Sequence, residues 1–469
     1  MNKLNKLLLI PVLFAGFFLR VHELGRESLW LDEGYMWVVV VNTSLRDVVM
    51  AMLPLNSTTP LGYVIIWLTV PLFGLTEFSL RMSSALIGLL VVPVVYRLGR
   101  EMFSGRVGVL AGACIALMPF LVWFARDAKP YAAYLLFSAL AMWGFWRFAQ
   151  GRGKALLIIA SMAWYLSHYL SALFAYAQAM FIFTRIRRAP LLLRQWVVMQ
   201  AIAVVPVAGW GLLFFTQTHR KLLNRVPWIP SVSVFTPLQT LWNYITGDAV
   251  EWNGLMVIGV LALVGLIVWG ARRLTIPAQL LLWWLCLPLI TGWLFSFYVP
   301  SYVDRYFTPI AVPLVLLLSA GLLELPPRVR YGAVAVVLIV MLTSTLRFFG
   351  DARFAKEDWR GAAEFATVHH LPIGVIDPES HTGLMPYLSS QTQVVLARDG
   401  QELSQRFSEG DMALLIRSPR ESAHALSKSA PFDPLAEGPE FFRQWLAENP
   451  SAVVDIHPFT GLALVVIGK

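Results

Sequence analysis

The sequence predicts an all-α polytopic membrane bundle of about eleven transmembrane helices, followed by a small C-terminal α/β domain. Of its 469 residues, 57% are hydrophobic and 14% are charged, whereas soluble domains carry about 25% charged residues. Apolar runs long enough to cross a bilayer recur from residue 4 to residue 349. Beyond residue 350 the composition becomes that of a soluble protein.

The membrane domain is expected to occupy residues 1–350. The first apolar run is followed by the charged and aromatic stretch HELGRESLWLDE rather than by a small-residue cleavage site, so we expect it to remain as a span. The expected crossings are residues 4–20, 81–98, 107–124, 131–149, 155–170, 170–185, 195–216, 254–271, 277–297, 307–323 and 331–349.

The loop charges predict the orientation. If residues 60–75 do not cross and the N-terminus is cytoplasmic, the cytoplasmic segments hold sixteen basic and two acidic residues. The opposite side, up to residue 350, then holds eleven basic and ten acidic residues. The positive-inside rule therefore favours an inside N-terminus, an outside C-terminus and a re-entrant or interfacial 60–75 segment. The net charge of +9 is thus a signal of orientation and not of nucleic-acid binding.

Residues 351–469 are predicted to form a separate extracytoplasmic domain. Helices fit DWRGAAEFATVHH and GPEFFRQWLAEN, and strands fit GVIDP, TQVVLA, MALLIRS, AVVDIHP and LALVVIG. Strands that alternate with helices indicate a small α/β domain. The two cysteines, Cys114 and Cys286, lie in apolar runs and form no disulfide framework.

An acidic pair, Asp32-Glu33, follows the first span. Adjacent carboxylates at a membrane surface are costly unless they are solvated, paired or bound to a metal ion. One interpretation is a solvated loop. Trp30, Leu31 and Tyr35 surround the pair with apolar surface and favour a cleft instead.

Two further polar clusters occupy outer span ends. Arg126, Asp127 and Lys129 lie in FARDAKPY, and Arg305 lies in SYVDRYFTP. Interfacial snorkelling explains isolated Arg and Lys residues, but a compact Arg/Lys pair also suits a phosphate group. Tyr306 is either a belt residue or a contact for an isoprenoid chain.

Several other residues are secondary candidates. His168 lies in SHYLS between two short spans, where a structural hydrogen bond is the alternative to a place in the site. The long loop 217–253 holds Asp248 and Glu251. No histidine metal site is proposed, because His369, His370 and His381 lack ligand spacing. The remaining secondary candidates are Arg81, Asp127 and Tyr131.

In their order along residues 1–365, these clusters resemble the bacterial members of the GT-C glycosyltransferase superfamily, and among them the protein O-mannosyltransferase and aminoarabinose transferase group (families 39 and 83). The pieces that carry the resemblance are SLWLDEGY, TTPLGYVIIW, EFSLRMSSALIGLLVVPVVYRLGREMFSGRVGVLAG, WFARDAKPYAAYLL, HYL, VPWIP, DRYFTPIAVPLVLLLSAGL and KEDWRGAAEF.

The resemblance implies a bundle with interfacial helices in the first outer loop, in a bacterial inner membrane. It implies transfer of a sugar from a polyprenyl-phosphate donor to an acceptor lipid, glycan or protein at the outer face, with inversion. Asp32 would be the catalytic base and Glu33 its neighbour. Arg126, Lys129 and Arg305 would bind the donor phosphate.

One position departs from the family pattern. Many relatives carry His or Lys just before the proline of the 60–75 segment, whereas this sequence has Thr58-Thr59-Pro60. A divalent metal ion therefore stays open, with Asp32 and Glu33 as its ligands if one binds. The non-enzyme alternatives are a polyprenyl-lipid or glycolipid transporter, which would place ionisable groups near mid-membrane, and a non-catalytic lipid-binding subunit of an envelope assembly.

Overall fold

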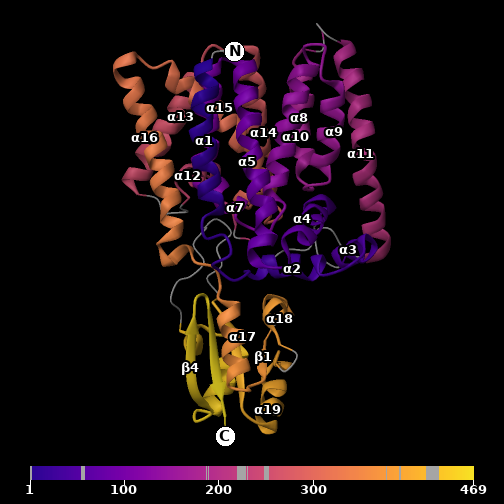
Figure 1. The fold of residues 1–469 in the computed structure, drawn as a ribbon, viewed down its shortest axis with the longest axis vertical. Coiled ribbons are helices and arrows are strands. Elements are labelled where there is room, and N and C mark those ends of the chain that lie inside the picture. Colours follow the sequence, from indigo (N-terminus) through magenta and orange to yellow (C-terminus); the bar gives the residue numbers. More distant parts are fainter. Residues whose placement is uncertain are drawn as a thin grey trace.

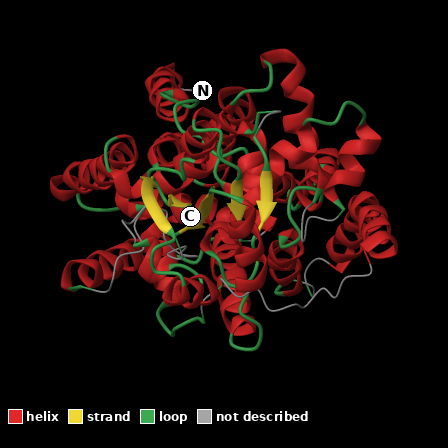
Figure 2. Ribbon diagram, turned by 90° about the horizontal axis from the view of Figure 1, so that it is seen from below, coloured by secondary structure: helices red, strands yellow, loops and turns green. Residues whose placement is uncertain are grey.

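The computed structural model describes residues 3–53, 59–185, 187, 190–218, 229, 231–247, 253–376, 378–389, 392–418 and 433–468. A helical bundle carries the N-terminus at one end and a small domain with the C-terminus at the other (Figure 1). Seen from that second end, the sheet of the small domain lies across the middle of the bundle (Figure 2).

The bundle follows the apolar pattern of the sequence, and every predicted crossing lies largely on helix. Its helices are α1 (Lys3–Val21), α2 (Leu31–Val40), α3 (Leu45–Met52), α4 (Pro60–Phe73), α5 (Glu77–Met102), α6 (Gly105–Leu117), α7 (Pro119–Ala125), α8 (Tyr131–Phe148), α9 (Lys154–Tyr165), α10 (Ser171–Phe183), α11 (Pro190–Thr218), α12 (Thr236–Thr246), α13 (Gly254–Ala271), α14 (Ile276–Ser296), the 3-10 helix η1 (Asp304–Ile310), α15 (Ala311–Leu323) and α16 (Pro327–Leu346).

By length and apolar composition, six helices in the described part of the chain qualify as membrane spans, or seven if the bent pair α6–α7 counts as one. Four further apolar helices are shorter, α4 among them with 14 residues. The predicted number of eleven crossings is therefore not confirmed. Helices α2, α3 and α4 gather at the end of the bundle that faces the small domain (Figure 1).

The expected span 107–124 is bent by 58° between α6 and α7. Pro119 provides the cause, since it has no N–H to donate to Ile115 and forces Met118 into an extended conformation. The guanidinium of Arg20 on α1 instead donates to the carbonyls of Ile115 and Ala116, at 3.1 and 2.9 Å. The bend carries the chain into the 126–130 turn.

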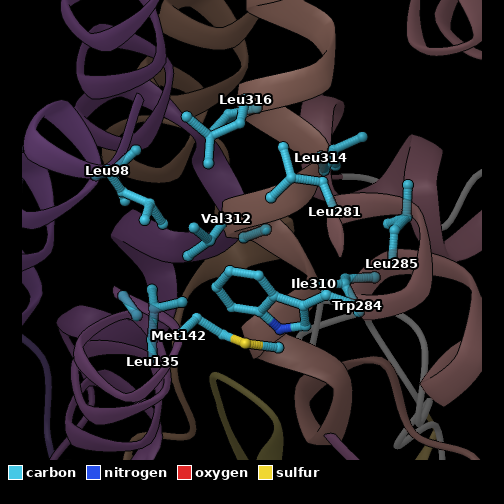
Figure 3. Close-up of a cluster of buried hydrophobic side chains, with 14 of the residues drawn as sticks. Leu98, Leu135, Met142, Leu281, Trp284, Leu285, Ile310, Val312, Leu314 and Leu316 are labelled. Carbon is cyan, nitrogen blue, oxygen red and sulfur yellow. The ribbon is translucent and has the colours of Figure 1, made fainter. Parts of the chain in front are cut away.

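Helix α15 forms the centre of the bundle, and each of its residues from 311 to 322 is buried. Trp284 of α14 packs beside Ile310, Met142 and Leu135 in this core (Figure 3). On another side, Gly270 of α13 lies directly against α15, because a Cβ there would overlap the carbonyl oxygen of Leu317. The backbones of α13 and α15 therefore approach closely, as small residues allow.

The small domain contains the predicted strands and helices. Its sheet has the order β2-β1-β3-β5-β4, with parallel pairing among the first three strands and antiparallel pairing among the last three. Its elements are α17 (Trp359–Val368), β1 (Ile373–Val375), α18 (Pro378–Leu384), β2 (Val394–Leu396), α19 (Gly400–Glu409), β3 (Met412–Arg417), α20 (Pro434–Glu437), α21 (Glu440–Glu448), β4 (Val453–Phe459) and β5 (Leu462–Ile467).

The two parts share a core. Trp30 and Leu31, at the start of α2, pack into the hydrophobic cluster of the small domain beside Trp359. Gly34 packs so tightly on α18 that a Cβ would come within 2.7 Å of the carbonyl oxygen of Thr382. The start of α2 is thus held by both parts of the protein.

Replacing Gly270 by Val should force α13 away from α15 and destabilise the fold by about 1–3 kcal/mol, the usual cost of overpacking. Thermal unfolding in detergent measures this as a lower midpoint. Gly265→Val is the control, because Gly265 lies on the same helix and a Cβ there would meet no atom within 4 Å. Equal midpoints for the two variants would contradict the close packing.

Candidate active site

Asp32 lies in the first turn of α2 and faces two cations. Its Oδ2 atom is 3.9 Å from Nζ of Lys129 and 3.8 Å from Nη2 of Arg305. The three residues come from α2, from the turn between α7 and α8, and from η1, so the fold joins three clusters that are far apart in the sequence. The Asp32 side chain keeps 25% of its exposure, which leaves it open to a substrate.

The side chain of Glu33, the next residue, is fully buried. Arg81 of α5 binds it with two hydrogen bonds, Nε to Oε1 at 2.8 Å and Nη2 to Oε2 at 2.6 Å. The backbone N–H of Ala128 donates to Oε1 at 2.7 Å. Because these groups orient Glu33 on several sides, it ties α2 to α5 and to the 126–130 turn.

Burial alone would raise the pKa of the Glu33 carboxyl. The charges of Arg81 and Lys356, with hydrogen bonds from Arg81 and Ala128, outweigh burial and hold that pKa well below its ordinary value of 4.5. Glu33 is therefore a charged structural residue, and it is not available to act as a base.

Lys356 is a site residue that was not among the residues predicted from the sequence. It precedes α17, and its ammonium donates to Oε2 of Glu33 at 3.1 Å and to Oδ1 of Asp127 at 2.6 Å. Its side chain is only 5% exposed. The segment KEDW carries part of the family resemblance, and a lysine beside two acids at the start of a domain was the available signal.

The 126–130 turn holds Lys129 in place through its backbone. The N–H of Lys129 donates to the carbonyl of Asp127 at 2.8 Å, and the hydroxyl of Ser84 donates to the carbonyl of Lys129 at 3.2 Å. Burial opposes the charge of the Lys129 side chain, but Asp32 and the phenols of Tyr63 and Tyr131 outweigh it and raise its pKa above 10.5. Lys129 is thus a fixed cation.

Arg305 is positioned by the residue before it. Asp304 is buried and accepts hydrogen bonds from Thr240 at 2.8 Å and from Asn243 at 2.7 Å, both on α12. This contact fixes η1 against α12. Because Asp304 anchors the helix, the neighbouring Arg305 side chain can extend towards Asp32.

An aromatic wall adjoins Arg305. The ring of His168 lies 4.6 Å from those of Tyr134 and Tyr169 and 5.3 Å from that of Tyr306. Tyr131 completes this group at 6.3 Å from His168. Both predicted tyrosines and His168 therefore gather on one side of the site, with His168 packed between rings.

Arg126 differs from the sequence expectation. It donates from Nη1 to the carbonyl of His22 at 2.6 Å and reaches the carbonyl of Arg20 at 3.4 Å. Carbonyls at the C-terminus of a helix lack partners within the helix, and Arg126 supplies donors to those of α1. The structure therefore groups Lys129, and not Arg126, with Asp32 and Arg305.

A metal ion does not fit between Asp32 and Glu33. The two carboxylates have different cationic partners, Lys129 and Arg305 for Asp32 and Arg81 for Glu33, and a metal ion between them would face these positive charges. Within the described ranges, no group of three or more His, Cys, Asp or Glu residues forms a metal cluster. The secondary candidates Asp248 and Glu251 lie outside the described residues.

Sequence comparison matches residues 57–210 to the family described as dolichyl-phosphate-mannose-protein mannosyltransferase. An uncharacterized protein of Aquifex aeolicus (strain VF5) is 24% identical over 231 residues, which cover 47% of this chain and 45% of that protein. The match thus spans less than half the length of this curated relative.

Solved structures are similar over almost the whole chain. ArnT from Cupriavidus metallidurans matches in its apo state with a TM-score of 0.61 and 15% identity, covering 98% of this chain and 97% of that one. Its form bound to undecaprenyl phosphate gives a TM-score of 0.60 at 15% identity, over 99% and 98% of the two chains. The arabinofuranosyltransferase AftD from mycobacteria gives 0.54 at 15% identity, over 100% of this chain and 40% of that one.

These likenesses confirm the resemblance to GT-C glycosyltransferases at the level of the fold. The chain is mostly helical, with several apolar helices, a small C-terminal sheet and an ArnT-like fold. Apolar helices and this fold together identify an integral membrane protein.

Glu33→Gln should destabilise the protein by about 3–5 kcal/mol, because it leaves Arg81 and Lys356 buried with one carboxylate fewer. Thermal or denaturant unfolding in detergent measures the loss. Glu402→Gln is the control, since Glu402 pairs with Arg398 on the surface, and its stability should equal that of the wild type. A Glu33→Gln variant as stable as the control would refute the structural role.

The same variant should alter the response to acid. Because the pKa of Glu33 is lower in the folded state, its contribution to stability is complete above 4.5 and is lost as the pH falls below that value. The stability difference between wild type and Glu33→Gln, measured by unfolding across this pH range, should therefore shrink in acid.

Proposed function

We propose that this protein is a membrane glycosyltransferase that moves a sugar from a polyprenyl-phosphate donor to an acceptor hydroxyl, with Asp32 as the base. The observation that carries the proposal is the carboxylate of Asp32 facing Lys129 and Arg305 at 3.9 and 3.8 Å. A base beside two fixed cations is what transfer from a phosphate leaving group needs.

The reaction is a single in-line displacement. The acceptor oxygen attacks the anomeric carbon as the bond from that carbon to the phosphate oxygen breaks, so the configuration inverts. Asp32 takes the hydroxyl proton, and the leaving group departs as a polyprenyl phosphate. Lys129 and Arg305 stabilise the negative charge that develops on this phosphate.

The spacing of the cations fits a role in binding the phosphate. At 3.8 to 3.9 Å, neither Lys129 nor Arg305 is within hydrogen-bond distance of Asp32 Oδ2. A donor phosphate carries more charge than one carboxylate and offers Arg305 a bidentate partner. The bound phosphate offsets the positive charge of both cations, and this raises the basicity of the Asp32 carboxylate when donor and acceptor are in place.

The comparisons support a lipid-phosphate donor. The family match is described by its dolichyl-phosphate-mannose substrate, and one neighbour of the same fold was solved with undecaprenyl phosphate. In this protein, three members of the aromatic wall beside Arg305, namely Tyr306, Tyr169 and His168, would bind the first isoprene units of the donor. The loop charges favour an extracytoplasmic site, on the side of the C-terminal domain.

The acceptor is expected to approach from the C-terminal domain. Arg417 of β3 pairs with Glu379 of α18 at 3.5 Å. Burial raises the pKa of Tyr35 to about 12, and the charges of Glu379 and Asp32 add to this effect. Gly34, two residues after Asp32, packs against Thr382 of α18. The C-terminal domain therefore borders the start of α2, and an acceptor hydroxyl must lie beside Asp32 there.

Asp32→Asn should lower transfer by roughly 10²–10⁴-fold, the usual contribution of a general base. Donor binding should be retained, because Lys129 and Arg305 are unchanged. A radiolabelled polyprenyl-phosphate sugar assay with purified protein measures the rate. Asp47→Asn, an exposed acid on α3, is the control and should transfer at the wild-type rate; near-normal turnover by Asp32→Asn would exclude Asp32 as the base.

Arg305→Gln should weaken binding of polyprenyl phosphate by about tenfold or more, since a charged hydrogen bond contributes about 1.5–3 kcal/mol. Titration of the purified protein with the lipid measures the affinity. Arg26→Gln is the control, because Arg26 is an exposed residue that pairs locally with Glu23. Equal affinities of Arg305→Gln and wild type would remove Arg305 from the donor site.

A further inference from the structure

We infer that Lys356, supplied by the segment that leads into the C-terminal domain, is a positioning residue that assembles the Asp32–Lys129 pair. The inference rests on the proposed function for its catalytic meaning, but the structural coupling it asserts can be tested without any substrate. It assigns to the segment that leads into the C-terminal domain a role in holding the active site together.

The geometry of Lys356 joins two segments that carry the site. One of its partners, Glu33, is the residue next to Asp32, and the other, Asp127, lies two residues before Lys129. The ammonium therefore bridges the start of α2 to the 126–130 turn. Through these neighbours it sets the distance between the base and the first of its cations.

Charge balance makes the bridge necessary. Glu33 and Asp127 are both fully buried, and Arg81 directs its two carboxylate hydrogen bonds to Glu33. Without Lys356, two buried carboxylates would share one guanidinium. Two negative charges in a dry site repel each other, and the segments that carry them separate or one of them takes up a proton.

The position of Lys356 is fixed by the contacts of its neighbours. Its own N–H donates to Oε1 of Glu27 at 3.1 Å. The hydroxyl of Ser28 donates to the carbonyl of Glu357 at 2.5 Å, and the N–H of Leu31 donates to the Glu357 carboxylate at 3.2 Å. Segments 27–31 and 356–357 are thus joined directly, so docking of the C-terminal domain delivers the ammonium to its two partners.

Arg360 offers a matched comparison. It is a second cation from the same segment, and it also pairs with a carboxylate of the bundle, Glu77, which accepts a further hydrogen bond from the hydroxyl of Tyr387. The Arg360 side chain is 41% exposed, against 5% for Lys356. Removing the charge of Arg360 weakens docking of the C-terminal domain but leaves Glu33 and Asp127 paired with Lys356. A comparison of variants at Arg360 and Lys356 therefore separates the effect of domain docking from the effect of positioning Asp32 and Lys129.

The experiment compares Lys356→Met, Arg360→Met and the double variant Lys356→Met/Asp127→Asn. Hydrogen exchange of peptides covering 27–36 and 124–131 should be faster by about tenfold or more in Lys356→Met, because an uncompensated buried charge favours local opening. Arg360→Met should leave the 124–131 peptide at the wild-type rate. The double variant should recover protection in both peptides, since it removes the excess negative charge.

Transfer activity gives the second measurement. Lys356→Met should lower kcat by about tenfold or more, because misplacement of the base costs rate, while the KM for donor changes less, and the double variant should recover part of kcat. Equal losses in Lys356→Met and Arg360→Met, or a double variant no better than Lys356→Met, would overturn the inference. If Lys356→Met does not fold, folding of the double variant supports it and failure of both overturns it.

The two proposals fail separately. A wild-type protein that transfers no sugar would refute the proposed function, while hydrogen exchange would still decide whether Lys356 couples α2 to the 126–130 turn. A wild-type protein that transfers sugar, with normal exchange in Lys356→Met, would refute only the inference about Lys356.

Discussion

The arrangement of the whole protein depends on one buried group of four charges, Glu33, Asp127, Arg81 and Lys356. Its members come from α2, the turn after α7, α5 and the segment before α17, so it joins the bundle to the C-terminal domain. A buried charge is tolerated only when it is paired and hydrogen-bonded. Each element must therefore reach its place before the others are stable in theirs.

This constraint explains how an adjacent acidic pair acquires two different roles. Successive side chains on an α-helix point about 100° apart, so once Glu33 is directed into the buried group, Asp32 must face outward. The same first turn of α2 then presents one carboxylate as a structural anchor and one as a partly exposed group facing Lys129 and Arg305. The rigidity of the first supports the placement of the second.

The features that follow from local pattern could be predicted from the sequence. Long apolar runs predicted the helices, and alternating strands and helices predicted the C-terminal sheet. The presence of Pro119 in the sequence does not by itself predict the bend between α6 and α7. Other helices contain a proline without such a break, as α5 does at Pro93. What differs at Pro119 is Arg20, which supplies the donors that a break in the helix requires.

The site was predictable in part, since Asp32, Lys129 and Arg305 stand in polar clusters at span ends, and span ends on one side of a bundle must lie near one another. Nothing in FARDAKPY shows that Arg126 turns to the carbonyls of α1 while Lys129 turns to Asp32, because the path of the backbone through the turn decides it.

The contacts of Lys356 likewise could not be predicted from the local sequence, and here the partners are much farther apart along the chain. Its role depends on the docking of a domain that begins more than 300 residues after Glu33. The lysine beside two acids in KEDW marks a charged segment, but it does not show which distant carboxylates that lysine meets. The contact has a consequence for the proposed reaction. The separation of Asp32 from Lys129 is set by the pair of carboxylates that Lys356 holds together. A base and a phosphate-binding cation must be close enough to serve one substrate but must not neutralise each other, and a bridge between their neighbours meets both conditions.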